Sequence, residues 1–146
     1  DTLFTRASRN MLWTPHNNFS ADHTHPKKVT SFSTYGLGWQ LSDYKGHFRV
    51  HHTGGYDGMI SAIQMFPDQK LGIILLTNGL RAPLSAIPNY IADAYLTGKN
   101  DRDWSKEQLA FTERREKADT RVADRRASSV LNTQPALKKD AMVGSY

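Results

Sequence analysis

The spacing of apolar and polar residues predicts a short helix and then a loop at the start of the chain. In residues 1–16, Thr5 or Ser8 can cap a helix, Met11 to Trp13 supply its apolar side chains, and Pro15 ends it. Residues 17–34 are polar and irregular, so we expect a surface loop there.

Residues 35–77 are predicted to form β-strands, and residues 35–41 and 47–52 show the period-two alternation of polar and apolar positions that is typical of them. We expect a turn at 43–46, a glycine-rich bend at 54–58 and a tight turn at 67–70. The strands between them would occupy residues 35–41, 47–52, 60–66 and 71–77. The last of these contains the apolar run Ile73 to Leu76, which is typical of a strand covered on both faces.

Residues 84–96 place apolar side chains at helical spacing, and Gly98 stands just beyond them as a stop signal. Such a helix would pack on the four strands. The sequence therefore predicts an α/β fold of the α+β type, in which an antiparallel sheet is packed by a C-terminal helix. Residues 99–126 differ, since they hold nine basic and seven acidic residues, and we expect a long, mostly solvated helix there.

Composition excludes several classes of protein. The chain has 146 residues, 38% of them hydrophobic, which suits one ordinary domain. It contains no cysteine, so disulfides, thiolate zinc sites and cysteine nucleophiles are excluded. No run of 18 apolar residues exists, so no transmembrane segment is expected. The start at Asp1, with neither an initiator Met nor a signal peptide, favours a processed or excised piece.

The net charge of +5 permits acidic partners. The charged helix carries nearly balanced signs, whereas a nucleic-acid-binding arm would be dominated by one sign, so we expect no nucleic-acid partner. A nucleic-acid-binding fragment is a weaker alternative that depends on the net charge alone.

The strongest candidate site is the sequence His52-Thr53-Gly54-Gly55 at the end of an expected strand. Two adjacent glycines let the backbone approach a ligand and direct amide N–H groups outward. Thr53 adds a hydroxyl, and His52 adds an imidazole, a group that changes charge near neutral pH. The alternative interpretation is a simple hairpin corner.

Two other patterns favour structural interpretations. Ser42 and Lys45 form an S-x-x-K sequence, but that chemistry needs a serine at a helix start and these residues lie between two expected strands. His16, His23 and His25 share a loop with Asp22 as the nearest carboxylate, so we expect a solvated loop and no metal site.

The order of these features resembles the serine beta-lactamase-related hydrolases, a penicillin-binding-protein-like family of bacteria. That family includes class C beta-lactamases, D-amino-acid peptidases and carboxylesterases. The resemblance covers roughly residues 3–98 and is carried by four segments: Tyr35-Gly-Leu-Gly-Trp39, His52-Thr-Gly-Gly-x-x-Gly58, Ile60-Ser-Ala62 and Leu71-Gly-Ile-Ile-Leu-Leu-Thr-Asn78. It implies a partial beta-lactamase/transpeptidase-like fold.

The resemblance also implies roles for the candidate site. His52 would replace the family's lysine and shape the electrostatics of the site, and the N–H of Gly55 would be an oxyanion donor. Thr53, Gly54 and Tyr56 would bind the substrate. The reaction would be acyl transfer to a serine and then to water, on an amide, ester or lactam, without a cofactor. The resemblance suggests a periplasmic or secreted protein, and no other feature of the sequence indicates a compartment.

The departure from the family is that neither its serine and lysine nor its tyrosine element has a counterpart here. We therefore expect residues 1–98 to be the C-terminal segment of a hydrolase domain, followed by a charged helical linker at 99–139. Residues 140–146 resemble the start of a further β domain. Expected partners are the missing N-terminal part of the hydrolase domain, a small-molecule or peptide substrate, and a second copy of the chain. The alternative is a non-catalytic binding or sensing module.

Overall fold

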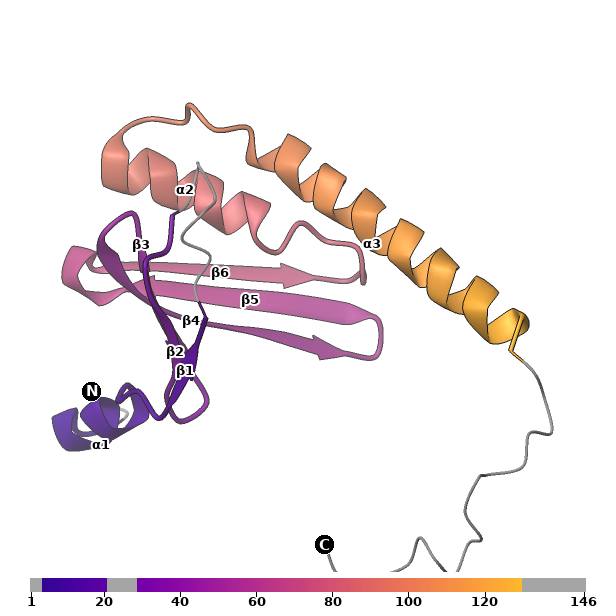
Figure 1. The fold of residues 1–146 in the computed structure, drawn as a ribbon. Helices are drawn as coiled ribbons and strands as arrows, with labels where there is room; N and C mark the ends of the chain where they lie inside the picture. Colours follow the sequence, from indigo (N-terminus) through magenta and orange to yellow (C-terminus); the bar gives the residue numbers. More distant parts are fainter. Residues whose placement is uncertain (1–3, 21–28, 130–146) are drawn as a thin grey trace, which may run out of the picture. The chain divides into compact units, whose positions relative to one another are not determined.

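Six antiparallel strands form one sheet in which each strand pairs with its neighbours in sequence, a simple meander (Figure 1). The computed structural model describes residues 4–20 and 29–129. The strands are β1 (Asn17–Phe19), β2 (Ser33–Tyr35), β3 (Gln40–Tyr44), β4 (His47–Tyr56), β5 (Met59–Phe66) and β6 (Leu71–Thr77). A 3₁₀ turn, η1 (Pro67–Gln69), joins β5 to β6.

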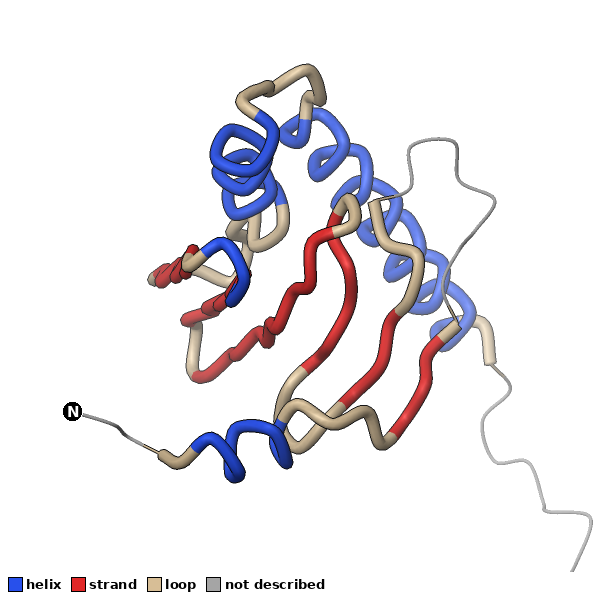
Figure 2. The backbone as a smooth tube through the Cα atoms, turned by 90° about the vertical axis from the view of Figure 1, so that its left-hand side faces the viewer, coloured by secondary structure: helices blue, strands red, loops and turns tan. Residues whose placement is uncertain are grey.

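Three helices accompany the sheet: α1 (Arg6–Leu12), α2 (Ala86–Thr97) and α3 (Trp104–Ala127). Figures 1 and 2 show α2 lying on one face of the sheet. Between them lies a core that includes Tyr44, Phe66, Ile73 and Ala92. The predicted antiparallel sheet packed by a helix is confirmed, and the cap of α1 is Thr5, whose Oγ1 accepts the N–H of Ser8 at 3.1 Å.

Two expectations for the first half of the sheet were wrong. Residues 17–34 are not only a loop, because they contain the paired strands β1 and β2. Residues 35–41 are not one strand, because Gly36 N–H bonds the Trp39 carbonyl at 2.8 Å and closes a turn between β2 and β3. Gly38 in this turn has a φ of 77°, a conformation that is unfavourable for residues other than glycine.

Two-residue turns set the β3–β4 and β4–β5 hairpins. Lys45 and Gly46 have φ values of 51° and 85°, and Asp57 and Gly58 have φ values of 40° and 88°. Positive φ at both central residues matches the twist of the flanking strands. The predicted glycine-rich bend at 54–58 was therefore misplaced, since β4 continues through both glycines to Tyr56 and only Asp57 and Gly58 turn.

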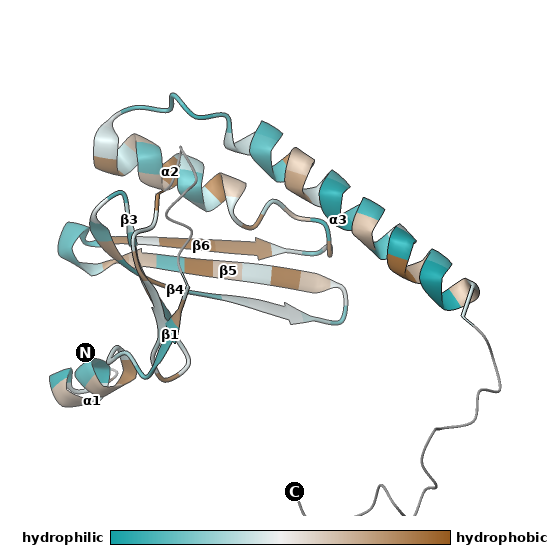
Figure 3. Ribbon diagram, viewed as in Figure 1, coloured by the Kyte–Doolittle hydropathy of each residue, from teal (hydrophilic) through white to brown (hydrophobic). Residues whose placement is uncertain are grey.

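The expectation that β6 is covered on both faces does not hold among the described residues. Ile73 faces the core and is buried, whereas Ile74 and Leu76 on the opposite face are 68% and 77% exposed. Figure 3 shows apolar stretches in β5 and β6, whereas α3 alternates between hydrophilic and hydrophobic residues along its length. One face of this edge strand thus presents large apolar side chains to solvent.

A buried carboxylate ties α2 to the sheet. Asp93 is fully buried, and its two oxygens accept hydrogen bonds from the Tyr44 hydroxyl and the Trp104 indole, each at 2.8 Å. Lys45 Nζ lies 2.7 Å from Asp93 Oδ1. Burial alone would raise the pKa of Asp93, but these three donors together hold it below its ordinary value.

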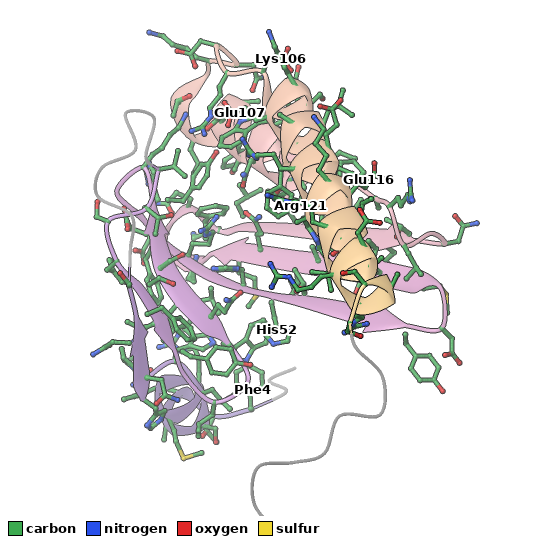
Figure 4. The ribbon with its side chains drawn as sticks, turned by 45° about the vertical axis from the view of Figure 1, so that its right-hand side comes forward. Phe4, His52, Lys106, Glu107, Glu116 and Arg121 are labelled. Carbon is green, nitrogen blue, oxygen red and sulfur yellow. The ribbon has the colours of Figure 1, made fainter. Side chains whose placement is uncertain are left out.

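The helix α3 begins in this core and then carries mostly charged residues. Trp104 is its one buried residue, and the Arg102 guanidinium lies 3.9 Å from the centre of the indole ring. Figure 4 labels Lys106, Glu107, Glu116 and Arg121 along its length. Residues up to Gln108 belong to one compact unit, and those from Leu109 onward belong to a second unit. No helix of the described residues is long and apolar enough to span a membrane.

Replacing Asp93 with alanine should destabilise the chain by about 2–5 kcal/mol, because the buried Tyr44 hydroxyl and Trp104 indole lose their acceptor and the Lys45 ammonium loses its ion pair. The free energy of unfolding in urea measures the effect. The matched control is Asp101→Ala, which removes an exposed carboxylate and should change stability by less than about 0.5 kcal/mol. Equal effects of the two variants would contradict a central role for Asp93.

The same carboxylate should make stability depend on pH on the acid side. The pKa of Asp93 is lower in the folded chain than in the unfolded chain. Its contribution to the free energy of unfolding is therefore complete above pH about 4 and is lost as the pH falls through the pKa of the folded state. Asp93→Ala should therefore lose less stability than the wild type between neutral pH and acid. Asp43, whose pKa is also lowered, would account for the pH dependence of stability that remains in the Asp93→Ala variant.

Candidate active site

The second half of β4 has one open edge. β3 pairs with β4 only as far as the Gln40–His51 pair, whereas β5 pairs with β4 from Val50 to Tyr56. No other described strand lies beside the segment 52–56, and residues 53–56 are exposed (Figure 1). In an antiparallel pair, every second residue directs its N–H and C=O away from its partner strand. This edge thus offers free backbone donors and acceptors to a ligand.

His52 stands at the start of this open edge (Figure 4). Its Nε2 lies 3.0 Å from the Tyr35 hydroxyl, and the two rings meet edge to face with centroids 6.1 Å apart. Successive side chains of a strand alternate between faces, so His52 and Tyr56 share one face and Thr53 lies on the other. At the usual rise per residue, His52 and Tyr56 are separated by about 13 Å along the strand.

His51 lies on the opposite face from His52 and has a structural environment. Its Nε2 lies 3.3 Å from Ser42 Oγ, which also accepts a 3.0 Å hydrogen bond from Arg49 Nε. Because arginine only donates, the serine hydroxyl accepts from Arg49 and can donate its own proton to Nε2 of a neutral His51. Burial, with the charges of Arg49 and His52, lowers the pKa of His51 to about 3.

The same contacts decide the role of the S-x-x-K sequence. Ser42 lies within β3, is only 1% exposed and serves as a bridge between Arg49 and His51. Lys45 is bound to Asp93. A substrate cannot reach the hydroxyl, and the lysine does not contact it. The expectation that this pair is structural agrees with the geometry.

The two glycines of the candidate site have different surroundings. A Cβ on Gly54 would lie 2.9 Å from Ser61 Oγ on β5, the end of a short polar side chain. A Cβ on Gly55 would meet Ile60 only at 3.5 Å, an ordinary contact. Between His52 and Tyr56 the edge is therefore bare backbone, apart from the side chain of Thr53.

The histidines of the first loop do not form a metal site in the described part of the chain. His16 precedes β1, whereas His23 and His25 lie outside the described residues. Across residues 4–20 and 29–129, no three His, Asp or Glu side chains come together in a way that could hold a metal ion.

Sequence reasoning missed Tyr35 as a member of the site. Its backbone is held by the end of α1: the Tyr35 carbonyl accepts the N–H of His16 at 2.8 Å, and Leu37 N–H bonds the Leu12 carbonyl at 3.0 Å. Gly36 lies so close to α1 that a Cβ there would come within 2.3 Å of the Leu12 oxygen. The sequence signal was the Tyr-Gly-x-Gly spacing, in which the first glycine lets Tyr35 sit against α1.

A comparison with protein families matches the greater part of this chain. Residues 7–96 match the family described as Beta-lactamase. This match covers more than half of the chain, so the chain belongs to the beta-lactamase family. It includes α1, all six strands and most of α2. Searches of curated proteins and of solved structures found no match.

Gly36→Ala should destabilise the chain by about 1–3 kcal/mol, because the added methyl group forces the β2–β3 turn away from the Leu12 carbonyl. The matched control is Gly72→Ala on β6, where a Cβ meets nothing within 4 Å and φ is not positive. Urea unfolding of both variants measures the difference. A Gly36→Ala variant as stable as Gly72→Ala would show that the close approach to α1 is not required.

Proposed function

We propose that this chain supplies one wall of the active site of a serine hydrolase that acts by acyl transfer on an amide, ester or beta-lactam. The observation that carries the proposal is the open, exposed edge of β4 beside His52, in a chain that belongs to the beta-lactamase family. A backbone N–H on this edge can stabilise the negative charge that develops on the substrate oxygen. We assign that role to Gly55.

The side chains around the edge complete the proposed wall. His52 contributes an imidazole ring near the reacting groups, and Thr53 contributes a hydroxyl for substrate binding. Gly54 leaves the backbone uncovered, so that a substrate can lie along it. Tyr56, 75% exposed at the far end, provides an aromatic surface for the part of the substrate away from the reacting bond.

The nucleophile of the proposed reaction comes from sequence outside the described residues. Within those residues, no serine side chain hydrogen-bonds a lysine, and Ser42 is buried. The partner in this proposal is a segment that bears the serine and lysine and packs with residues 1–98 as one domain. Residues 99–139 then act as a charged linker, although Trp104 at its start still contributes to the core.

The second candidate is a non-catalytic binding module of the same fold. The open edge of β4 favours it as well, because an extended ligand can add to such an edge through backbone hydrogen bonds alone. The two candidates differ in whether a complete protein containing this chain forms an acyl-enzyme. Mass spectrometry after incubation with a beta-lactam or an activated ester separates them, since only the hydrolase gains the mass of the acyl group.

The 146-residue chain alone should show no saturable turnover of a chromogenic ester or a chromogenic cephalosporin, because it holds no activated serine. Initial rates measured against substrate concentration provide the test. Ser42→Ala is the control, and it should leave the background rate unchanged. Saturable turnover that disappears in Ser42→Ala would show that Ser42 is accessible and nucleophilic after all.

In the enzyme completed by the serine-bearing segment, His52→Ala should lower kcat/KM by roughly 10²–10⁴-fold, the range for an acid–base side chain. His51→Ala is the matched control, because His51 lies on the opposite face and bonds Ser42. It should lower the melting temperature while changing kcat/KM far less. Equally small effects of both changes on kcat/KM would leave His52 with a structural role only.

A further inference from the structure

We infer that Tyr35 is the positioning residue for His52: its hydroxyl holds the imidazole through Nε2 and leaves Nδ1 as the nitrogen available to a ligand. This inference rests on the proposed function for the statement that His52 belongs to an active site. The contact itself does not depend on the proposed function. It is a 3.0 Å hydrogen bond between side chains 17 residues apart, with the two rings edge to face.

Tyr35 can act as the fixed member of the pair because the structure holds it independently of His52. Its carbonyl accepts the N–H of His16, and its ring meets Phe19 edge to face with centroids 6.2 Å apart. The next residue, Gly36, lies against the Leu12 carbonyl at the end of α1. Backbone and ring are thus anchored on α1 and β1, so the hydroxyl occupies a defined point in front of β4.

The chemistry of the imidazole makes this contact consequential. A neutral imidazole has one N–H donor and one acceptor nitrogen, and a hydroxyl can pair with either. With Nε2 engaged by Tyr35, Nδ1 remains, and no described residue hydrogen-bonds it. His51 is held in the same way through its own Nε2, by Ser42, but on the opposite face of β4. The geometry therefore assigns the ligand-facing nitrogen of His52.

The test uses Tyr35→Phe, which keeps the ring and its contact with Phe19 but removes the hydroxyl. In the ¹⁵N-labelled 146-residue chain, NMR of the His52 ring should show a change at Nε2 that exceeds the change at Nδ1. Tyr90→Phe, which removes an exposed hydroxyl from α2, is the matched control and should move neither signal. An unchanged Nε2 signal in Tyr35→Phe, or equal changes in both variants, would overturn the inference.

A second measurement separates this inference from the proposed function. In the completed enzyme, Tyr35→Phe should lower kcat/KM by roughly 2- to 10-fold, the effect expected for the loss of one neutral hydrogen bond. The pH dependence of kcat/KM should also change, without a corresponding decrease in the melting temperature. If Nε2 shifts but neither Tyr35→Phe nor His52→Ala affects the rate, the contact is upheld and the proposed function fails. If only His52→Ala affects the rate and Nε2 is unmoved, the positioning role of Tyr35 fails.

Discussion

The Asp93 carboxylate is the constraint on which the rest of the structure depends. A charge removed from water costs several kcal/mol unless its oxygens are fully paired, and here the donors come from β3, from the β3–β4 turn and from the start of α3. Since those three donors must converge on one residue of α2, the helix can take only one position on the sheet. The same pairing fixes the turn at Lys45 from which β4 begins.

That turn determines which histidine faces outward. The two-residue turn pairs Tyr44 with His47, and every later pair of β3 and β4 follows from it, up to Gln40 with His51. A slip of one residue would exchange the faces of all side chains on β4. His51 would then lose Ser42, and His52 would turn into the core. Strand register therefore decides which histidine bonds Ser42 within the sheet and which stands beside the open edge of β4.

The sequence predicted those parts of the fold whose signals are local. Apolar stretches on either side of the tight turn at 67–70 indicated β5 and β6, and helical spacing with a terminal glycine indicated α2, whose C-cap Gly98 has a φ of 67°. β1 and β2 were missed because three-residue strands of polar residues show no alternation and form only by pairing with distant neighbours. The sequence predicted a candidate site at His52 and the two glycines, but it did not predict the contact of His52 with Tyr35, which forms only once β2, β3 and β4 have assembled.

The glycines of β4 show how one sequence feature serves fold and site together. Adjacent glycines normally weaken a strand because they add backbone entropy and no packing, and for that reason they suggested a bend. The ladder with β5 holds them extended through the pairs Gly54–Ser61 and Gly55–Ile60. Because the edge facing away from β5 then carries almost no side chains, a ligand bound there as proposed would contact the backbone directly. Its selectivity must come from the residues that flank the glycines, His52, Thr53 and Tyr56, and His52 among them is already held in place by Tyr35.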